Sequence, residues 1–183
     1  MIMTVAELRQ VADTDATDQA LEARLLALEL LIRAYTNNNF QARAFRSAAA
    51  AVSTGKTLLV ENSGLFKAND TLQITDSALN AGLVNVRTSS GGTVTVKEEL
   101  YDEAEITVTK VVYPADVKMG VANLMKWELE RREKVGLASE SLSRHSVTFA
   151  DQTGANTVMG YPLALMGFLA PYMRARVGQG VGV

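Results

Sequence analysis

The hydrophobic positions in the first part of the chain follow a helical period. Within residues 18–36, apolar side chains recur at i, i+4, i+7 and i+11, the spacing of one helix face: Leu21, Leu25, Leu28 and Ile32. Glu29 and Arg33 are expected to form an i,i+4 pair elsewhere on the helix surface. Three asparagines at 37–39 end the helix, because their side chains compete for backbone hydrogen bonds. A capping-box pattern predicts a shorter helix over residues 4–12.

A two-residue period replaces the helical one between residues 56 and 112. Apolar and polar side chains alternate there, as in strands that bury one face. Clusters of Asn, Gly and Ser at 69–70, 80–82 and 89–92 supply turns. These features predict a small antiparallel β-module of about five strands. The alanine-rich stretch before it, residues 41–52, is predicted to be a short helix from intrinsic propensity alone.

The helical period returns after the β-module. Pro114 suits the first position of a helix and Gly136 suits a C-cap, so a helix is predicted from about residue 114 to 135. Its first half carries an apolar stripe. The same face becomes charged in the second half, at Glu128, Arg131 and Arg132. This pattern is typical of a helix that is buried at one end only.

The last part of the chain contains a predicted lone strand and a short helix. His145, Val147 and Phe149 alternate with polar residues from Arg144 onward, and no obvious partner strand lies nearby in the sequence. A short apolar helix is expected between Pro162 and Pro171. Glycines in the final residues predict a flexible tail over 174–183.

These elements predict an α+β fold, namely a small helical bundle with an inserted antiparallel β-module. Residues 1–55 and 113–183 would form the helical core, and residues 56–112 would form the insertion. A chain of 183 residues suits one domain with such an insertion.

Composition narrows the function classes. The 18 basic and 20 acidic residues give a net charge of -2, without the excess of Lys and Arg that non-specific phosphate binding needs. The absence of cysteine excludes disulfides, thiolate metal sites and cysteine nucleophiles, and it fits a reducing cytoplasm. No secretory signal is expected, because residues 1–4 lack a basic region followed by a long apolar stretch. No membrane segment is expected, because the longest apolar stretch, 161–172, is interrupted by prolines and is shorter than the roughly 20 residues that span a bilayer.

Candidate catalytic motifs are weak. Gly-Lys-Thr at 55–57 resembles the end of a phosphate-binding loop, but the first glycine of that motif falls at Ala50 and a strand follows, so a turn is favoured. His145 is the only histidine, and the nearby serines lie in no nucleophile elbow. An acidic group without calcium-loop spacing is expected to form a solvated turn: Glu98, Glu99, Asp102, Glu103 and Glu105. No catalytic, cofactor or metal site is predicted.

Four segments, in this order, resemble the head-tail connector family of tailed bacteriophages, the gp6-like neck adaptors. They are 31–41, 113–121, 139–147, and 161–162 together with 171–174. The resemblance covers roughly residues 1–50 and 113–176, and its motifs are structural rather than catalytic. Residues 66–82 are similar to a β-module of some phage neck proteins, which compact connectors lack.

The resemblance implies a helical fold of connector type and a structural subunit instead of an enzyme. Family members assemble as rings, typically dodecamers, beneath the portal, where they extend the DNA channel and offer a platform for the next neck or tail protein. The expected partners are therefore further copies of the chain, the portal protein and a downstream neck or tail completion protein. DNA would pass through the channel without sequence-specific binding, and no membrane would be involved. The expected location is the neck of the virion, and the host cytoplasm during assembly.

Surfaces that need a neighbour predict the contacts of this ring. The charged helix end, the lone strand and the basic tail supply the candidates for oligomer or portal contact: Glu128, Arg131, Arg132, Arg144, His145, Val147, Phe149, Arg174 and Arg176. A nucleic-acid-binding module that uses Arg131, Arg132 and Lys134 in a groove is the alternative, although basic residues at a helix C-terminus also complement its dipole. A hydrolase, with His145 as its base, is the third hypothesis.

Overall fold

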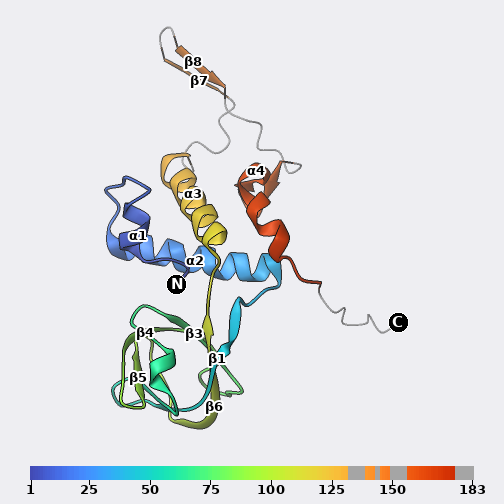
Figure 1. The fold of residues 1–183 in the computed structure, drawn as a ribbon. Helices are drawn as coiled ribbons and strands as arrows, with labels where there is room; N and C mark the ends of the chain where they lie inside the picture. Colours follow the sequence, from blue (N-terminus) through green and yellow to red (C-terminus); the bar gives the residue numbers. More distant parts are fainter. Residues whose placement is uncertain (132–138, 143–144, 149–155, 176–183) are drawn as a thin grey trace. The chain divides into compact units, whose positions relative to one another are not determined.

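The computed structural model describes residues 1–131, 139–142, 145–148 and 156–175, without the side chains of residues 131–155. The chain divides into two compact units (Figure 1). One comprises Met1–Thr4 and Asn39–Tyr113, and we name it the barrel unit. The other comprises Val5–Asn38 and Pro114–Val183, and we name it the helical unit.

The barrel unit contains six antiparallel strands that close in the order β1-β2-β5-β4-β3-β6. Their bounds are β1 Gln41–Val52, β2 Thr57–Val60, β3 Thr71–Thr75, β4 Gly82–Ser90, β5 Thr93–Val96 and β6 Glu103–Val111, with a 3-10 helix, η1, at Ser63–Leu65. Closure pairs every strand on both sides, so no barrel edge is left open. Five of these strands lie within residues 56–112, as the two-residue period predicts.

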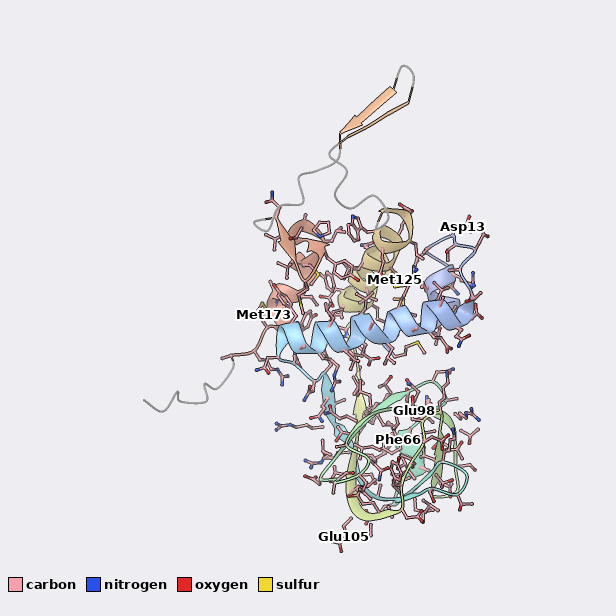
Figure 2. The ribbon with its side chains drawn as sticks, turned by 180° about the vertical axis from the view of Figure 1, so that it is seen from behind. Asp13, Phe66, Glu98, Glu105, Met125 and Met173 are labelled. Atoms are coloured by element: carbon pink, nitrogen blue, oxygen red, sulfur yellow. The ribbon has the colours of Figure 1, made fainter. Side chains whose placement is uncertain are left out.

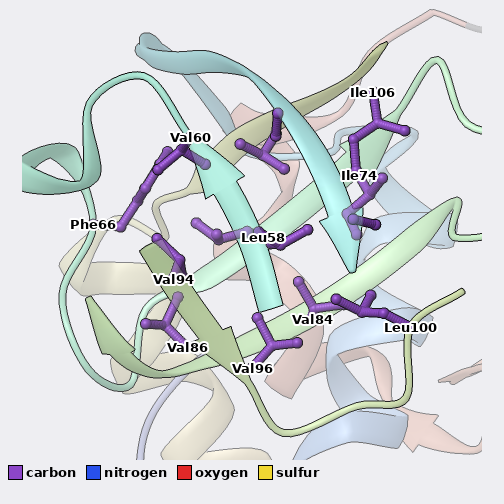
Figure 3. Packing of buried hydrophobic residues seen from close by; sticks show 14 residues of the cluster. Leu58, Val60, Phe66, Ile74, Val84, Val86, Val94, Val96, Leu100 and Ile106 are labelled. Atoms are coloured by element: carbon purple, nitrogen blue, oxygen red, sulfur yellow. The ribbon is translucent and has the colours of Figure 1, made fainter. Parts of the chain in front are cut away.

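Apolar side chains that alternate along the strands fill the barrel (Figure 3). Each of the six strands contributes two residues to this core, as Leu58 and Val60 do from β2. Leu58, Leu72 and Val94 have no exposed surface. Burial of such a side chain stabilises the fold by about 1.5–3 kcal/mol, so this cluster is the main source of barrel stability.

The prediction of a helix at 41–52 is wrong, because this segment is strand β1. It pairs with β2 on one side and with β6 on the other, and it thereby closes the barrel. Ala49 and Ala51 point into the core while Ala48 is exposed, so the segment does alternate. A run of alanines conceals that alternation because inward and outward residues are alike, and pairing outweighs a weak helix propensity.

The turn predicted at 89–92 is confirmed. Ser90 pairs with Thr93, and the two residues between them, Gly91 and Gly92, have φ angles of 56° and 80°. A two-residue hairpin turn that matches strand twist needs positive φ at both positions, which glycine adopts without strain.

The helical unit is built on two long helices, α2 (Asp18–Thr36) and α3 (Ala115–Arg131). The predicted apolar stripe of α2 is confirmed, since Leu21, Leu25, Leu28 and Ile32 are at most 2% exposed. Thr17 caps its start and Asn37, with φ 49°, caps its end. The shorter elements are α1 Val5–Arg9, β9 Thr157–Val158, β10 Tyr161–Pro162, α4 Leu163–Met166 and the 3-10 helix η3 Gly167–Tyr172.

Two further expectations for the helical unit are wrong. Glu29 and Arg33 do not lie on the surface, because they are 0% and 9% exposed. The strand at 144–149 is not alone, because β8 (His145–Thr148) pairs antiparallel with β7 (Ser139–Leu142). The partner is the neighbouring segment, whose Ser-Glu-Ser-Leu sequence has too little apolar character to suggest a strand.

The fold class therefore differs from the expectation of a helical bundle with an inserted module. The described residues contain a closed six-stranded barrel, which is larger than the two-stranded sheets β9–β10 and β7–β8, and four α-helices. The difference arises chiefly from β1, which moves residues 41–52 from the expected helical part into the barrel.

Candidate functional site

The C-terminal end of α2 binds the last residue of η3 and the residues that follow it. Three hydrogen bonds join them: Arg174 N to Thr36 O at 2.8 Å, Asn38 Nδ2 to Tyr172 O at 3.1 Å, and Asn37 Nδ2 to Ala175 O at 3.1 Å. A helix end leaves carbonyl groups without helical partners, and Arg174 satisfies one of them from far along the chain. The left-handed backbone of Asn37 ends the helix at this point.

The start of α3 joins the same site through Asp116. The hydroxyl of Tyr172 donates to this carboxylate, at 2.8 Å from Oδ1 and 2.7 Å from Oδ2. The hydrogen bond to Asp116 is the main cause that raises the pKa of Tyr172, and desolvation and the negative charge of Asp116 add to it. We name Thr36, Asn37, Asn38, Asp116, Tyr172 and Arg174 the helix-end cluster.

An open groove of about 300 Å³ lies beside this cluster, between α3 and the α4–η3 segment. Its lining is mainly apolar: Asp116, Met119, Gly120, Asn123, Ala164, Leu165 and Phe168. A Cβ atom on Gly120 would lie 2.5 Å from three ring carbons of Phe168, so the close packing of this ring on α3 requires glycine. Met119 is 55% exposed beside it.

The second half of α3 contacts β10. The Trp127 and Tyr161 rings lie 5.6 Å apart, and the Tyr161 hydroxyl donates to Glu128 at 2.7 Å. Val117, Val121, Leu124 and Met125, which precede this contact along the helix, are fully buried, whereas residues 126–130 are partly or fully exposed. The expectation that this helix is buried at one end is thus confirmed over its described length.

The predicted contact residues are only partly brought together. Glu128 is held by Tyr161, and Arg174 is anchored through its backbone while its side chain is exposed. His145 and Val147 lie on β8, opposite Leu142 and Glu140. Arg131 ends α3, but its side chain lies outside the described residues, as do Arg132, Lys134, Arg144, Phe149 and Arg176 entirely.

The acidic group at 98–105 holds the barrel loops together. Glu98 accepts hydrogen bonds from Asn85, Glu99 pairs with Lys56, and Asp102 accepts the Ser53 amide at 2.6 Å. That backbone hydrogen bond, followed by the one to the Ser53 side chain, lowers the pKa of Asp102.

Glu103 makes the densest set of these contacts. Its carboxylate accepts hydrogen bonds from the Ser77 hydroxyl, the Ala78 amide and the Asn80 side chain, at 2.5, 2.6 and 2.8 Å. These bonds, led by the one from Ser77, lower the pKa of Glu103 to about 2. The expectation of a merely solvated turn therefore misses a structural role.

The Gly-Lys-Thr segment lies at the hairpin between β1 and β2. Gly55 and Lys56 have positive φ angles of 74° and 52°, and Lys56 Nζ donates to Lys97 O at 3.2 Å. The segment leads into a strand, so its backbone amides do not open a helix as a phosphate-binding loop would.

Within the described part of the chain, no group of three or more His, Cys, Asp or Glu side chains is placed to hold a metal ion. None of the helices in the described ranges combines the length and the apolar character needed to cross a bilayer. Comparison with protein-family models and with curated proteins found no match to this chain.

Of the helix-end cluster, only Arg174 was among the residues predicted for the site, although all of its members lie in the segments that resemble connectors. Asn37 and Asn38 were assigned to helix termination, and Asp116 to the first turn of a helix. A polar tyrosine-arginine pair after the last proline was the available signal, but sequence spacing could not pair Tyr172 with Asp116, which lies 56 positions earlier.

Proposed function

We propose that this protein is a structural subunit of the head-tail connector of a tailed bacteriophage. Copies of the chain would form a ring under the portal, extend the DNA channel and offer a docking platform to the next neck or tail protein. The role is architectural, and no residue is assigned to catalysis.

The helix-end cluster carries this proposal. Three of the segments that resemble connectors, 31–41, 113–121 and 171–174, are far apart in the sequence and meet through the hydrogen bonds of Asn38, Tyr172 and Asp116. If the resemblance were accidental, there would be no reason for its separate motifs to share one site. Their contact supports a common structural purpose, which is to fix the ends of α2 and α3 to the end of η3.

A second support is the distribution of exposed surface in the helical unit. The apolar face of α3 is buried as far as Met125 and residues 126–130 are partly or fully exposed, and Met119 and Leu163 are 55% and 49% exposed. Apolar and charged surface of this kind suits a subunit that neighbours complete.

The test is assembly of the purified full chain, alone and with portal rings, followed by negative-stain microscopy and light scattering. The expected result is a ring, or a monomer that forms a ring on the portal. A protein that stays monomeric and is not recruited by the portal would show the proposal to be wrong. Salt-dependent gel shifts with DNA and no ring would favour the nucleic-acid-binding alternative instead.

The carrying observation has its own test. Asn38→Ala and Tyr172→Phe remove side-chain hydrogen bonds of the cluster, and Asn62→Ala is a matched control in the barrel unit, where Asn62 makes a comparable local bond to the Gly64 amide at 3.1 Å. Recruitment to the portal should weaken in the first two variants and persist in the control. Equal recruitment of all three variants to the portal would show that the helix-end cluster does not contribute to assembly.

A further inference from the structure

A basic pocket lies on the outside of the barrel. Its volume is about 280 Å³, and each of its five lining side chains can donate a hydrogen bond: Gln41, Arg43, Arg46, Thr75 and Thr109. Arg46 already holds a carboxylate of its own chain, with Nη2 at 3.5 Å from Asp76 Oδ2. Arg43 is exposed and forms no ion pair with any described residue. Because Gln41 already donates to Gln73 Oε1 at 3.2 Å, the guanidinium of Arg43 is the cationic group that this pocket offers to an anion.

A bulge in β1 pushes the basic side chains outward. Between the pairs Gln41–Val111 and Arg46–Thr109, β1 advances five residues while β6 advances two. The extra residues project from the barrel, and Phe45 among them is 40% exposed. The same bulge of β1 thus carries Arg43 and the exposed ring of Phe45, and Lys110 Nζ lies 5.6 Å from the centroid of that ring.

An acidic surface lies toward the opposite end of β6. Glu105 is exposed, projects from the rim of the barrel (Figure 2) and has a φ of 59°. A residue with a Cβ atom is strained in this left-handed region, where glycine or asparagine is usual, and such strain often marks functional positions. Glu105 forms no ion pair within the described residues.

Two exposed apolar side chains belong to the same end of the barrel. Leu79 and Tyr101 are 60% and 63% exposed. Their loops are held rigidly: Tyr101 N donates to Asn80 Oδ1 at 2.8 Å, Asn80 Nδ2 donates to Tyr101 O at 3.0 Å, and Glu103 binds the 77–80 turn. Because these hydrogen bonds hold the backbone of both loops, little backbone entropy is lost on binding, and an exposed tyrosine is suited to anchor a protein interface.

We infer that the acidic end of one barrel, with Glu105, Leu79 and Tyr101, docks on the basic pocket of a second copy, where Arg43 and Phe45 receive it. The two surfaces match in charge and in apolar content, and one chain carries both. They differ from each other, so the contact is heterologous, and a heterologous contact generates a ring when its rotation closes. The inference rests on the proposed connector function and adds the barrel as a ring contact. With a net charge of -2, the chain favours a protein carboxylate over nucleic-acid phosphate as the occupant.

Charge exchange on the full chain tests this contact. Arg43→Glu and Glu105→Arg each place like charges across the interface, whereas the double variant restores an opposite pair with reversed sign. The association constant between copies, measured by sedimentation velocity at low salt, should fall at least tenfold in each single variant. In the double variant it should return to within about threefold of the parent value. Exposed Arg87→Glu and Glu61→Arg provide the matched controls on the same barrel, and their assembly should not change.

Cysteine cross-linking covers a contact too weak to sediment, because the chain has no native cysteine. Oxidation of mixed Arg43→Cys and Glu105→Cys proteins should yield the mixed disulfide at least tenfold faster than Arg87→Cys mixed with Glu105→Cys. Equal rates, together with no rescue by charge exchange, would overturn the barrel contact. If rings form on the portal under that outcome, the connector proposal stands and only the barrel contact fails. If neither the barrel contact nor a ring on the portal is observed, both the barrel contact and the connector proposal are refuted. If the chain binds DNA in a salt-dependent way and Arg43→Glu abolishes that binding, the ligand of the pocket is a phosphate and not a protein carboxylate.

Discussion

Gly120→Ala should destabilise the helical unit, although alanine is the better helix former. The added Cβ atom would lie 2.5 Å from Cδ1, Cδ2 and Cε1 of Phe168, so the ring has to move out of its place on α3. Overpacking of this kind costs about 1–3 kcal/mol. Replacing a helical glycine by alanine gains about 1 kcal/mol in propensity. The net expectation is a loss of about 1 kcal/mol, or about 2–4 °C in melting temperature.

The chain supplies its own control and its own probe. Gly167 has a φ of -58° and no atom within 4 Å of an added Cβ, so Gly167→Ala should stabilise by about 0.4–1 kcal/mol. Trp127 is the only tryptophan, and it lies in α3 beside Tyr161. Urea unfolding followed by its fluorescence therefore reports on the helical unit, whether or not the barrel unfolds in the same transition.

A second parent protein, Phe168→Ala, distinguishes the steric clash with the Phe168 side chain from other causes of destabilisation. In Phe168→Ala the obstacle is gone, so Gly120→Ala should become neutral or stabilising there, and the two substitutions should show a clear coupling free energy. The reasoning is refuted if Gly120→Ala raises stability in the parent, or if it destabilises equally in both backgrounds.

Three other changes test the barrel and the helix-end cluster. Glu103 has a folded pKa of about 2, below its ordinary 4.5, so the stability that it contributes is present above pH 4.5 and is lost as the pH falls toward 2. Glu103→Gln should therefore reduce the fall in the melting temperature of the barrel between about pH 5 and 2. An unchanged fall in melting temperature would contradict this. Leu58→Ala should cost about 2–5 kcal/mol in unfolding free energy by denaturant titration monitored by circular dichroism, and a loss under 1 kcal/mol would place Leu58 outside a tight core. Because Asp116 raises the pKa of Tyr172, ultraviolet titration should show one tyrosine that ionises at higher pH than the others. Asp116→Asn should move the pKa of this tyrosine down toward the ordinary value. A parent titration in which no tyrosine ionises at higher pH would contradict the hydrogen bond between Tyr172 and Asp116.

The strongly patterned elements could be predicted from the sequence. Helix α2 has an uninterrupted apolar stripe and ends at asparagines, and the structure has both features. The strands β3 to β6 alternate valine, isoleucine or leucine with polar residues, so their period is visible without a structure. In these segments the local pattern and the tertiary environment demand the same conformation.

Elements without contrast were decided by tertiary structure. The alanines of β1 look alike on both faces, so only pairing with β2 and β6 shows which face is inward. Glu29 and Arg33 have the i,i+4 spacing of a surface pair, and their burial depends on what packs over that face of α2. The pairing of β8 with β7 depends on backbone hydrogen bonds, and the polar sequence of β7 has no alternating apolar pattern from which a strand could be predicted.

The candidate site divides in the same way. The segments that resemble connectors are visible in the sequence, and so is the change from apolar to charged surface along α3. Their meeting point is not, because the Tyr172 hydroxyl reaches Asp116 across 56 positions of chain, and Asn38 reaches Tyr172 across 134. Sequence patterns record which side chains an element turns inward, whereas contacts between distant elements depend on the path of the whole chain, which only the tertiary structure contains.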